Sequence, residues 1–173
     1  MIRETRLAPL LNDYQPGYSA SDCIDASAFG GKLDDLEADY QRFLDMRDAL
    51  APGMVVVAHS YDIIKPTNKV TEILWGIEVV GPWIMPELSK REIPTSLHIP
   101  IVEFLLSNFR ERLEQLQNQT DNFYLADTQG TLTPGKAADW KDEIHPTPKG
   151  FEKIANRLYA EAQSRVPQLT AIP

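Results

Sequence analysis

Apolar residues recur at helical spacing between residues 27 and 50. They fall three, four and seven positions apart, so one face of the predicted helix is apolar and the opposite face is largely acidic. The apolar positions are Phe29, Leu33, Leu36, Tyr40, Phe43 and Leu50. Pro52 and Gly53 are expected to end this helix.

Two short apolar segments are typical of strands that are covered on both faces of a parallel sheet. Residues 54–59 are apolar and rich in valine, so we expect a central strand there, and residues 122–127 predict a second strand. A helical pattern at residues 95–118 lies between them, with Pro100 expected in its first turn. A strand, a helix and a parallel strand make a right-handed βαβ unit.

Helical periodicity returns at residues 149–165, where Phe151, Ile154, Leu158 and Ala162 are expected to face the core. Residues 60–94 are rich in proline, glycine and tryptophan and are long for a connection, which indicates a binding loop that carries short elements. This order of elements predicts an α/β fold with parallel strands flanked by helices. Nothing in the sequence divides residues 1–173 into two domains.

Composition and charge narrow the function classes. The chain has 173 residues, 43% hydrophobic and 24% charged, as in one domain with a single core. A net charge of −8 argues against nucleic acid or an anionic membrane as a partner. The longest apolar runs fall well short of the roughly 20 residues that span a bilayer. No signal peptide is visible, so a cytoplasmic location is the default expectation, and the single Cys23 is expected to be buried.

Residues 139–151 contain the candidate chemistry. Asp142 stands three residues before His145, and two prolines then fix the loop ahead of the last helix. In this arrangement Asp142 can orient the imidazole through Nδ1, so that Nε2 acts as a general base toward a hydroxyl. Asp139 and Glu143 are alternative orienting carboxylates. The spacing favours Asp142, because Glu143 would point elsewhere in an extended loop and Asp139 is expected to cap or pair at the surface.

This segment, Asp-x-x-His-Pro-Thr followed by Gly150-Phe151 and a helix, resembles the last block of the SGNH (GDSL-type) hydrolases. The strand ending in residues 59–62, the Gly-Pro-Trp loop at residues 81–83 and the strand ending in Asp127 extend the resemblance over nearly the whole chain. The resemblance implies a flavodoxin-like, three-layer α/β/α fold and a carboxylic-ester hydrolase that acts on a small ester without a cofactor. The family's Gly-Asp-Ser and Gly-x-Asn-Asp blocks are missing here. The chain therefore resembles the C-terminal two thirds of such an enzyme, with an incomplete sheet that lacks its N-terminal strands.

Ligands in open α/β sheets bind beyond the carboxyl ends of the strands, which is where these segments are expected to meet. Alongside the catalytic pair Asp142 and His145, the predicted substrate-binding residues are His59, Ser60, Tyr61, Asp62 and Trp83. Ser60 lacks the flanking glycines of a nucleophile elbow and is not expected to be the nucleophile. His59, Asp62 and His145 are too scattered in sequence to predict a zinc site, so we expect no metal.

Two interpretations of different class remain. In the first, the chain is the C-terminal part of an SGNH esterase whose start lies upstream, and it is inactive alone. In the second, it is a non-catalytic relative that binds a small acyl or sugar ligand, or a partner chain, through the same rim. Under the first interpretation, some of the strands against which the apolar faces of the helices at residues 27–50 and 149–165 would pack are missing. Self-association is then expected.

Overall fold

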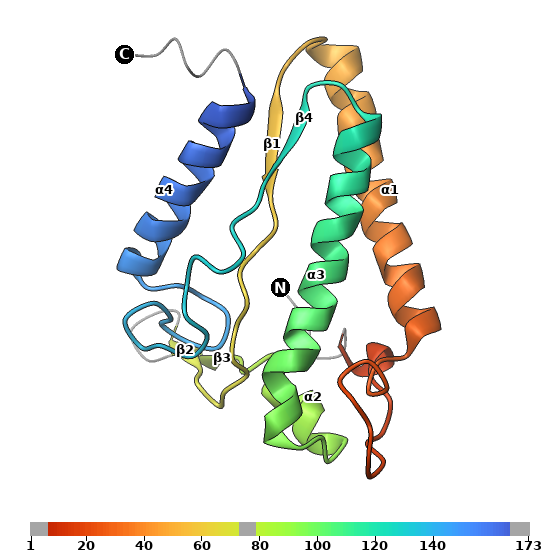
Figure 1. Ribbon diagram of the computed structural model, residues 1–173, viewed down its shortest axis with the longest axis vertical. Helices are drawn as coiled ribbons and strands as arrows, with labels where there is room; N and C mark the ends of the chain where they lie inside the picture. Colours follow the sequence, from red (N-terminus) through yellow and green to blue (C-terminus); the bar gives the residue numbers. More distant parts are fainter. Residues whose placement is uncertain (1–6, 73–78, 167–173) are drawn as a thin grey trace.

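The protein has a mixed α/β fold in a computed structural model that describes residues 7–72 and 79–166. The elements are a 3₁₀ turn (Ala8–Leu10), α1 (Ala26–Leu50), β1 (Val56–His59), β2 (Thr71–Glu72), β3 (Val79–Val80), α2 (Met85–Lys90), α3 (Thr95–Gln119), β4 (Phe123–Ala126) and α4 (Pro148–Arg165). Helix α4 lies on one side of the parallel pair β1 and β4, and α1 and α3 lie on the other (Figure 1). The predicted class, parallel strands flanked by helices, is confirmed.

The long helices agree with the sequence periodicity to within a residue or two. Helix α1 begins after Asp25, whose carboxylate accepts a hydrogen bond of 2.9 Å from the Ala28 N–H and so caps the helix. Helix α3 begins directly after Pro94. Pro100 was expected in the first turn of this helix, but it lies beyond that turn. Pro100 therefore removes one hydrogen bond from the helix interior. None of the described helices combines the length and hydrophobicity that a bilayer-spanning segment requires.

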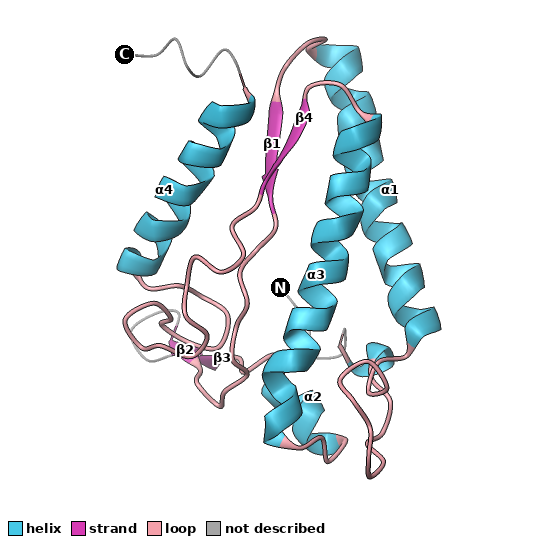
Figure 2. Cartoon of the chain, viewed as in Figure 1, coloured by secondary structure: helices cyan, strands magenta, loops and turns pink. Residues whose placement is uncertain are grey.

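The main sheet consists of β1 and β4, which pair in parallel with Val56 opposite Phe123 and His59 opposite Ala126. The expectation of a central β1 is wrong for the described residues, because β1 pairs only with β4 there. Within the described part of the chain each strand consequently has an unpaired edge, and Val56 and Val57 are only partly buried. Both strands are also short, and most of the chain at their carboxyl ends is loop (Figure 2).

Three apolar clusters hold these layers together. One lies between α1, α3 and the sheet and consists of Leu44, Ala58, Leu113, Leu116, Phe123 and Leu125. A second, around Cys23, Leu88 and Ile101, packs the N-terminal segment against α2 and α3, and Cys23 is buried as expected. The third, containing Ile64, Val102, Leu132 and Trp140, supports the loops at the carboxyl ends of the strands.

Helix α4 buries less of its apolar face than the sequence predicts. Ala162 is buried, whereas Ile154 and Leu158 are only partly covered. Phe151 was expected to face the core, but its side chain is 56% exposed. Its position in the first turn of α4 places it beyond the short β4 strand, at the loops rather than over the sheet.

Candidate functional site

The carboxyl ends of β1 and β4 are tied together by Ser60. Its hydroxyl donates to an Asp127 carboxylate oxygen at 3.0 Å and accepts the Thr128 N–H at 3.0 Å. Ser60 is fully buried, and these two hydrogen bonds connect the segments that follow β1 and β4. This geometry gives Ser60 a structural role at the rim, while its predicted role in substrate binding stays a prediction.

Asp142 and His145 form the hydrogen bond that their spacing predicts. The ring Nδ1 of His145 lies 2.9 Å from one Asp142 carboxylate oxygen and 3.0 Å from the other. Asp142 also accepts the backbone N–H groups of Ile144 and His145, at 2.9 and 2.8 Å, so it organises the turn that presents the ring. The Asp142 side chain is fully buried, whereas that of His145 is 47% exposed. A buried carboxylate thus holds one ring nitrogen of an accessible imidazole.

The segment after His145 is fixed against the loop before it. Thr147 caps α4, because its hydroxyl accepts the Gly150 N–H at 3.0 Å, and Pro148 takes the first helical position. Gly150 lies so close to the Asp139 carbonyl that a Cβ there would collide with it. The Thr-Pro-x-Gly sequence therefore sets where α4 begins relative to the His145 turn.

Glu143 is a buried carboxylate whose role sequence reasoning missed. It accepts backbone N–H groups from Ile84 at 2.8 Å and Met85 at 2.7 Å, and a further hydrogen bond from the Trp83 N–H. A longer bond of 3.4 Å comes from the Thr67 N–H. Helix α2 has no capping side chain of its own, so Glu143 supplies the acceptor from a distant segment. The sequence signal was an acidic residue beside Asp142, without any indication of its partners.

Trp83 reaches the site through this anchoring. Its indole ring meets the His145 imidazole edge to face, with ring centroids 5.3 Å apart and planes at 77°. Trp83 is 8% exposed, so it forms an apolar wall beside the imidazole rather than a flexible surface group. Trp75, the other tryptophan of this loop, lies outside the described residues.

Asp139 behaves differently from the sequence expectation. Asp139 is buried rather than at the surface. It accepts a hydrogen bond from Lys153 Nζ at 2.6 Å and one from the Thr133 N–H at 3.1 Å. The hydrogen bond from Lys153, followed by that from Thr133, lowers the pKa of Asp139. The carboxylate pins α4 to the loop after β4, which explains why Asp142 and not Asp139 orients His145.

Tyr61 lies between the strand end and the His145 loop. Its backbone has a φ of 58°, and its hydroxyl donates a hydrogen bond to the Ile144 carbonyl. Burial, together with the charges of Asp142 and Asp62, raises the pKa of Tyr61 to about 12. The phenol therefore stays protonated and remains a donor that supports the loop carrying His145.

His59 and Asp62 flank Tyr61. Burial lowers the pKa of His59, so its neutral form is favoured, and its Nδ1 accepts the Tyr61 N–H at 3.3 Å. Asp62 is buried and accepts N–H groups from Ile63, Gly130 and Leu132 at 2.6–2.8 Å. These three hydrogen bonds tie the loop after β4 to the segment that follows β1.

A pocket of about 230 Å³ brings four of the predicted residues together, namely His59, Tyr61, Asp62 and His145. Trp140, Pro146, Phe151 and Ile154 complete its lining. Ser60 does not line it, and Trp83 contributes through its contact with the His145 ring. The expectation that His145 shares a face with His59 and Asp62 at the carboxyl end of β1 is confirmed.

The contact with Asp142 orients the His145 imidazole so that it can act as a general base. In the described part of the chain no hydrogen bond from a serine, threonine or cysteine side chain reaches the His145 ring, so a nucleophile is not identified there. Among the described residues no group of three or more histidine, cysteine, aspartate or glutamate side chains is placed to hold a metal ion.

Comparisons with protein-family models, with curated proteins and with solved structures gave no match for this chain.

Proposed function

We propose that this chain carries the general-base half of a serine ester hydrolase of the SGNH type. The observation that supports this most directly is the fully buried Asp142 carboxylate 2.9 Å from Nδ1 of an imidazole that is itself 47% exposed. The Asp-x-x-His-Pro-Thr sequence, the position beyond the carboxyl end of β1 and the pocket beside it agree with the same assignment.

The chemistry assigned to each residue follows from these contacts. Asp142 keeps the proton on Nδ1, which leaves the Nε2 lone pair to take a proton from a serine hydroxyl. Asp142 then stabilises the imidazolium that forms. Trp83 limits the directions from which water and substrate approach the ring. Tyr61 and Asp62 hold the surrounding loops and are assigned no proton transfer.

The serine nucleophile and the oxyanion donors belong, in this proposal, to residues other than the described ones. Ser60 is unsuited to the role because its hydroxyl is buried and committed to Asp127 and Thr128. An imidazole without a nucleophile supplies little rate enhancement, because the members of a catalytic triad act as a unit. We therefore expect the 173-residue chain alone to hydrolyse a short activated ester no faster than its His145→Ala variant.

The decisive experiment compares this chain with a longer one that includes the segment encoded immediately upstream in its gene. Hydrolysis of p-nitrophenyl acetate and butyrate is measured for both. We expect the longer chain to be active, and His145→Ala or Asp142→Asn to lower its kcat by about 10⁴-fold. Glu111→Gln, an exposed change on α3, serves as the control and should leave the rate unchanged.

Two outcomes would contradict the proposal. An upstream segment without Gly-Asp-Ser, or a longer chain that is inactive, would favour the non-catalytic binding protein. A shorter chain whose activity disappears in His145→Ala would show that the nucleophile lies within these 173 residues, and Ser60→Ala would be tested next.

A further inference from the structure

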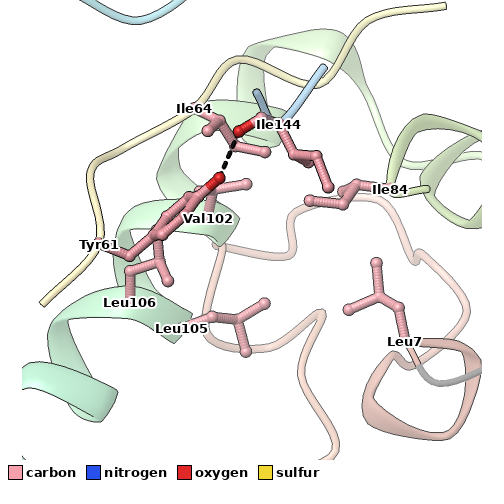
Figure 3. Close-up of a pocket in the computed structure, with 8 residues that line it drawn as sticks. All are labelled: Leu7, Tyr61, Ile64, Ile84, Val102, Leu105, Leu106 and Ile144. Carbon is pink, nitrogen blue, oxygen red and sulfur yellow. Dashed lines mark hydrogen bonds between the residues drawn. The ribbon is translucent and has the colours of Figure 1, made fainter. Parts of the chain in front are cut away.

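A second pocket, of about 270 Å³, shares Tyr61 with the His145 pocket. It is lined by eight side chains drawn from the N-terminal segment, the loop after β1, the start of α2, helix α3 and the His145 loop. These are Leu7, Tyr61, Ile64, Ile84, Val102, Leu105, Leu106 and Ile144 (Figure 3). Their side chains point toward a shared space, as the close-up shows.

The lining of this second pocket excludes polar ligands. Tyr61 has the only polar side chain among the eight, and its hydroxyl is committed to the Ile144 carbonyl (Figure 3). A sugar, an amino acid or a charged group would therefore lose its hydrogen bonds to water without replacing them. Water in such a pocket also lacks partners, so an aliphatic group gains by displacing it.

The position of this pocket links it to the candidate chemistry. Tyr61 lines both pockets. Ile144 lines the apolar pocket, and His145, the next residue, lines the other. The apolar pocket therefore lies next to the pocket that contains the imidazole. The two pockets together fit an amphiphile with one polar end.

We propose that the apolar pocket holds the aliphatic acyl chain of the ester on which His145 acts. That the occupant is an acyl group rests on the proposed function, whereas the aliphatic character of the site rests on the pocket lining alone. A small pocket lined by side chains from five segments suits one flexible chain better than a protein surface, which needs a broad exposed patch.

The first test uses straight-chain alcohols from 1-butanol to 1-octanol, which carry the chain without an ester. Binding is followed through the ¹³C-methyl NMR signals of Val102, Leu105, Leu106 and Ile144. We expect these signals to shift and Kd to fall about threefold to fourfold for each added methylene until the pocket is full. Signals that do not shift, or a Kd that is independent of chain length, would overturn the proposal.

Two substitutions at Leu105 test the location in opposite directions. Leu105→Trp fills the space and should weaken 1-octanol binding at least tenfold, while Leu105→Ala enlarges it and should extend the series to longer alcohols. Ala38→Trp, at an exposed position on the polar face of α1, is the matched control and should change neither. If Leu105→Trp does not fold, Leu105→Ala still decides, because unchanged chain-length preference in that variant would contradict the site.

The same measurements separate this inference from the proposed function. His145→Ala should leave alcohol binding unchanged, because His145 does not line the apolar pocket. Alcohol binding in a longer chain that shows no esterase activity would support the aliphatic site and contradict the proposed function. Esterase activity that does not depend on acyl length would support the proposed function and contradict the assignment of the apolar pocket to the acyl chain.

Discussion

The rings of Trp83 and His145 meet edge to face, with their centroids 5.3 Å apart, although 62 positions separate them in sequence. Neighbouring carboxylates hold the two partners, since Asp142 binds the His145 ring and Glu143 binds the backbone that carries Trp83. One dipeptide therefore organises both sides of the contact. Its two members bind different segments, since Asp142 binds N–H groups of its own turn and Glu143 binds those of residues 83–85.

The first prediction concerns Glu143. Glu143→Gln leaves one oxygen to accept N–H bonds and places an amide N–H₂ against backbone donors that need an acceptor. We expect it to lower the free energy of unfolding by about 2 kcal/mol, measured by urea titration. The Trp83 and His145 ring signals should also move in NMR spectra, because the Trp83 backbone loses its anchor.

The exposed Glu111→Gln is the control for this prediction and should change the free energy of unfolding by less than about 0.5 kcal/mol. A Glu143→Gln variant with wild-type stability and unchanged ring signals would show that the capping contacts of Glu143 contribute nothing to the site.

The second prediction concerns the tautomer of His145. With Asp142 intact, we expect the neutral ring to carry its proton on Nδ1, because that nitrogen lies 2.9 Å from an Asp142 carboxylate oxygen. Asp142→Asn should produce a mixture of tautomers, detected in long-range ¹H–¹⁵N spectra at pH 8. His59 provides an internal comparison in the same spectra, and its pattern should not change. An Nε2–H tautomer in the unsubstituted protein would contradict the proposed general base.

The third prediction uses the raised pKa of Tyr61. Since this pKa is about 12 in the folded protein and ordinarily 10, the folded state retains a proton that the unfolded chain loses between those values. Stability should therefore fall as pH rises from about 10 toward 12, by at most roughly 2–3 kcal/mol from this residue. Urea titrations of Tyr61→Phe between pH 9 and 11.5 should show a correspondingly shallower decline.

At neutral pH, Tyr61→Phe should itself be less stable by about 1 kcal/mol, because the Ile144 carbonyl loses its donor. Tyr159→Phe, at a half-exposed position on α4, is the control and should retain the alkaline slope of the unsubstituted protein. Equal alkaline slopes for Tyr61→Phe and Tyr159→Phe would rule out a buried, perturbed phenol at position 61.

Much of the fold could be predicted because its long elements have strong local signals. The apolar spacing of α1 and α3 continues for many turns, and Pro52, Gly53 and Pro94 mark helix ends independently of any tertiary contact. The sheet was harder to predict, because apolar content alone does not show how many neighbours a strand has. Residues 54–59 have the composition of a central strand, yet β1 pairs with one described neighbour.

The candidate site divides in the same way. The contact between Asp142 and His145 follows from a three-residue spacing within one turn, which is local information. The hydrogen-bond partners of the buried residues Ser60, Glu143 and Asp139 come from other segments of the chain, apart from the nearby Thr133. A polar residue alone does not show whether it meets solvent, a ligand or backbone N–H groups, so these roles required the folded arrangement.

The last prediction is self-association through the exposed apolar stripe on α1, which consists of Phe43, Met46 and Leu50. These side chains are 44%, 53% and 79% exposed, and their spacing places them on one helix face beside the buried one. Met54, two residues before β1, is also exposed, and among the described residues one edge of β1 is unpaired. Apolar surface next to an unpaired strand edge favours contact with another chain.

We expect sedimentation velocity to show the sedimentation coefficient rising with protein concentration, and Met46→Lys with Leu50→Lys to abolish that rise. The lysines lie in the last turns of α1, where positive charge suits the helix dipole, so the monomer should keep its stability. Ala38→Lys with Gln41→Lys adds the same charge to the polar face and should leave association unchanged. A monomer at every concentration, with a cooperative thermal transition, would contradict this prediction, because these apolar groups would then be stable in contact with water.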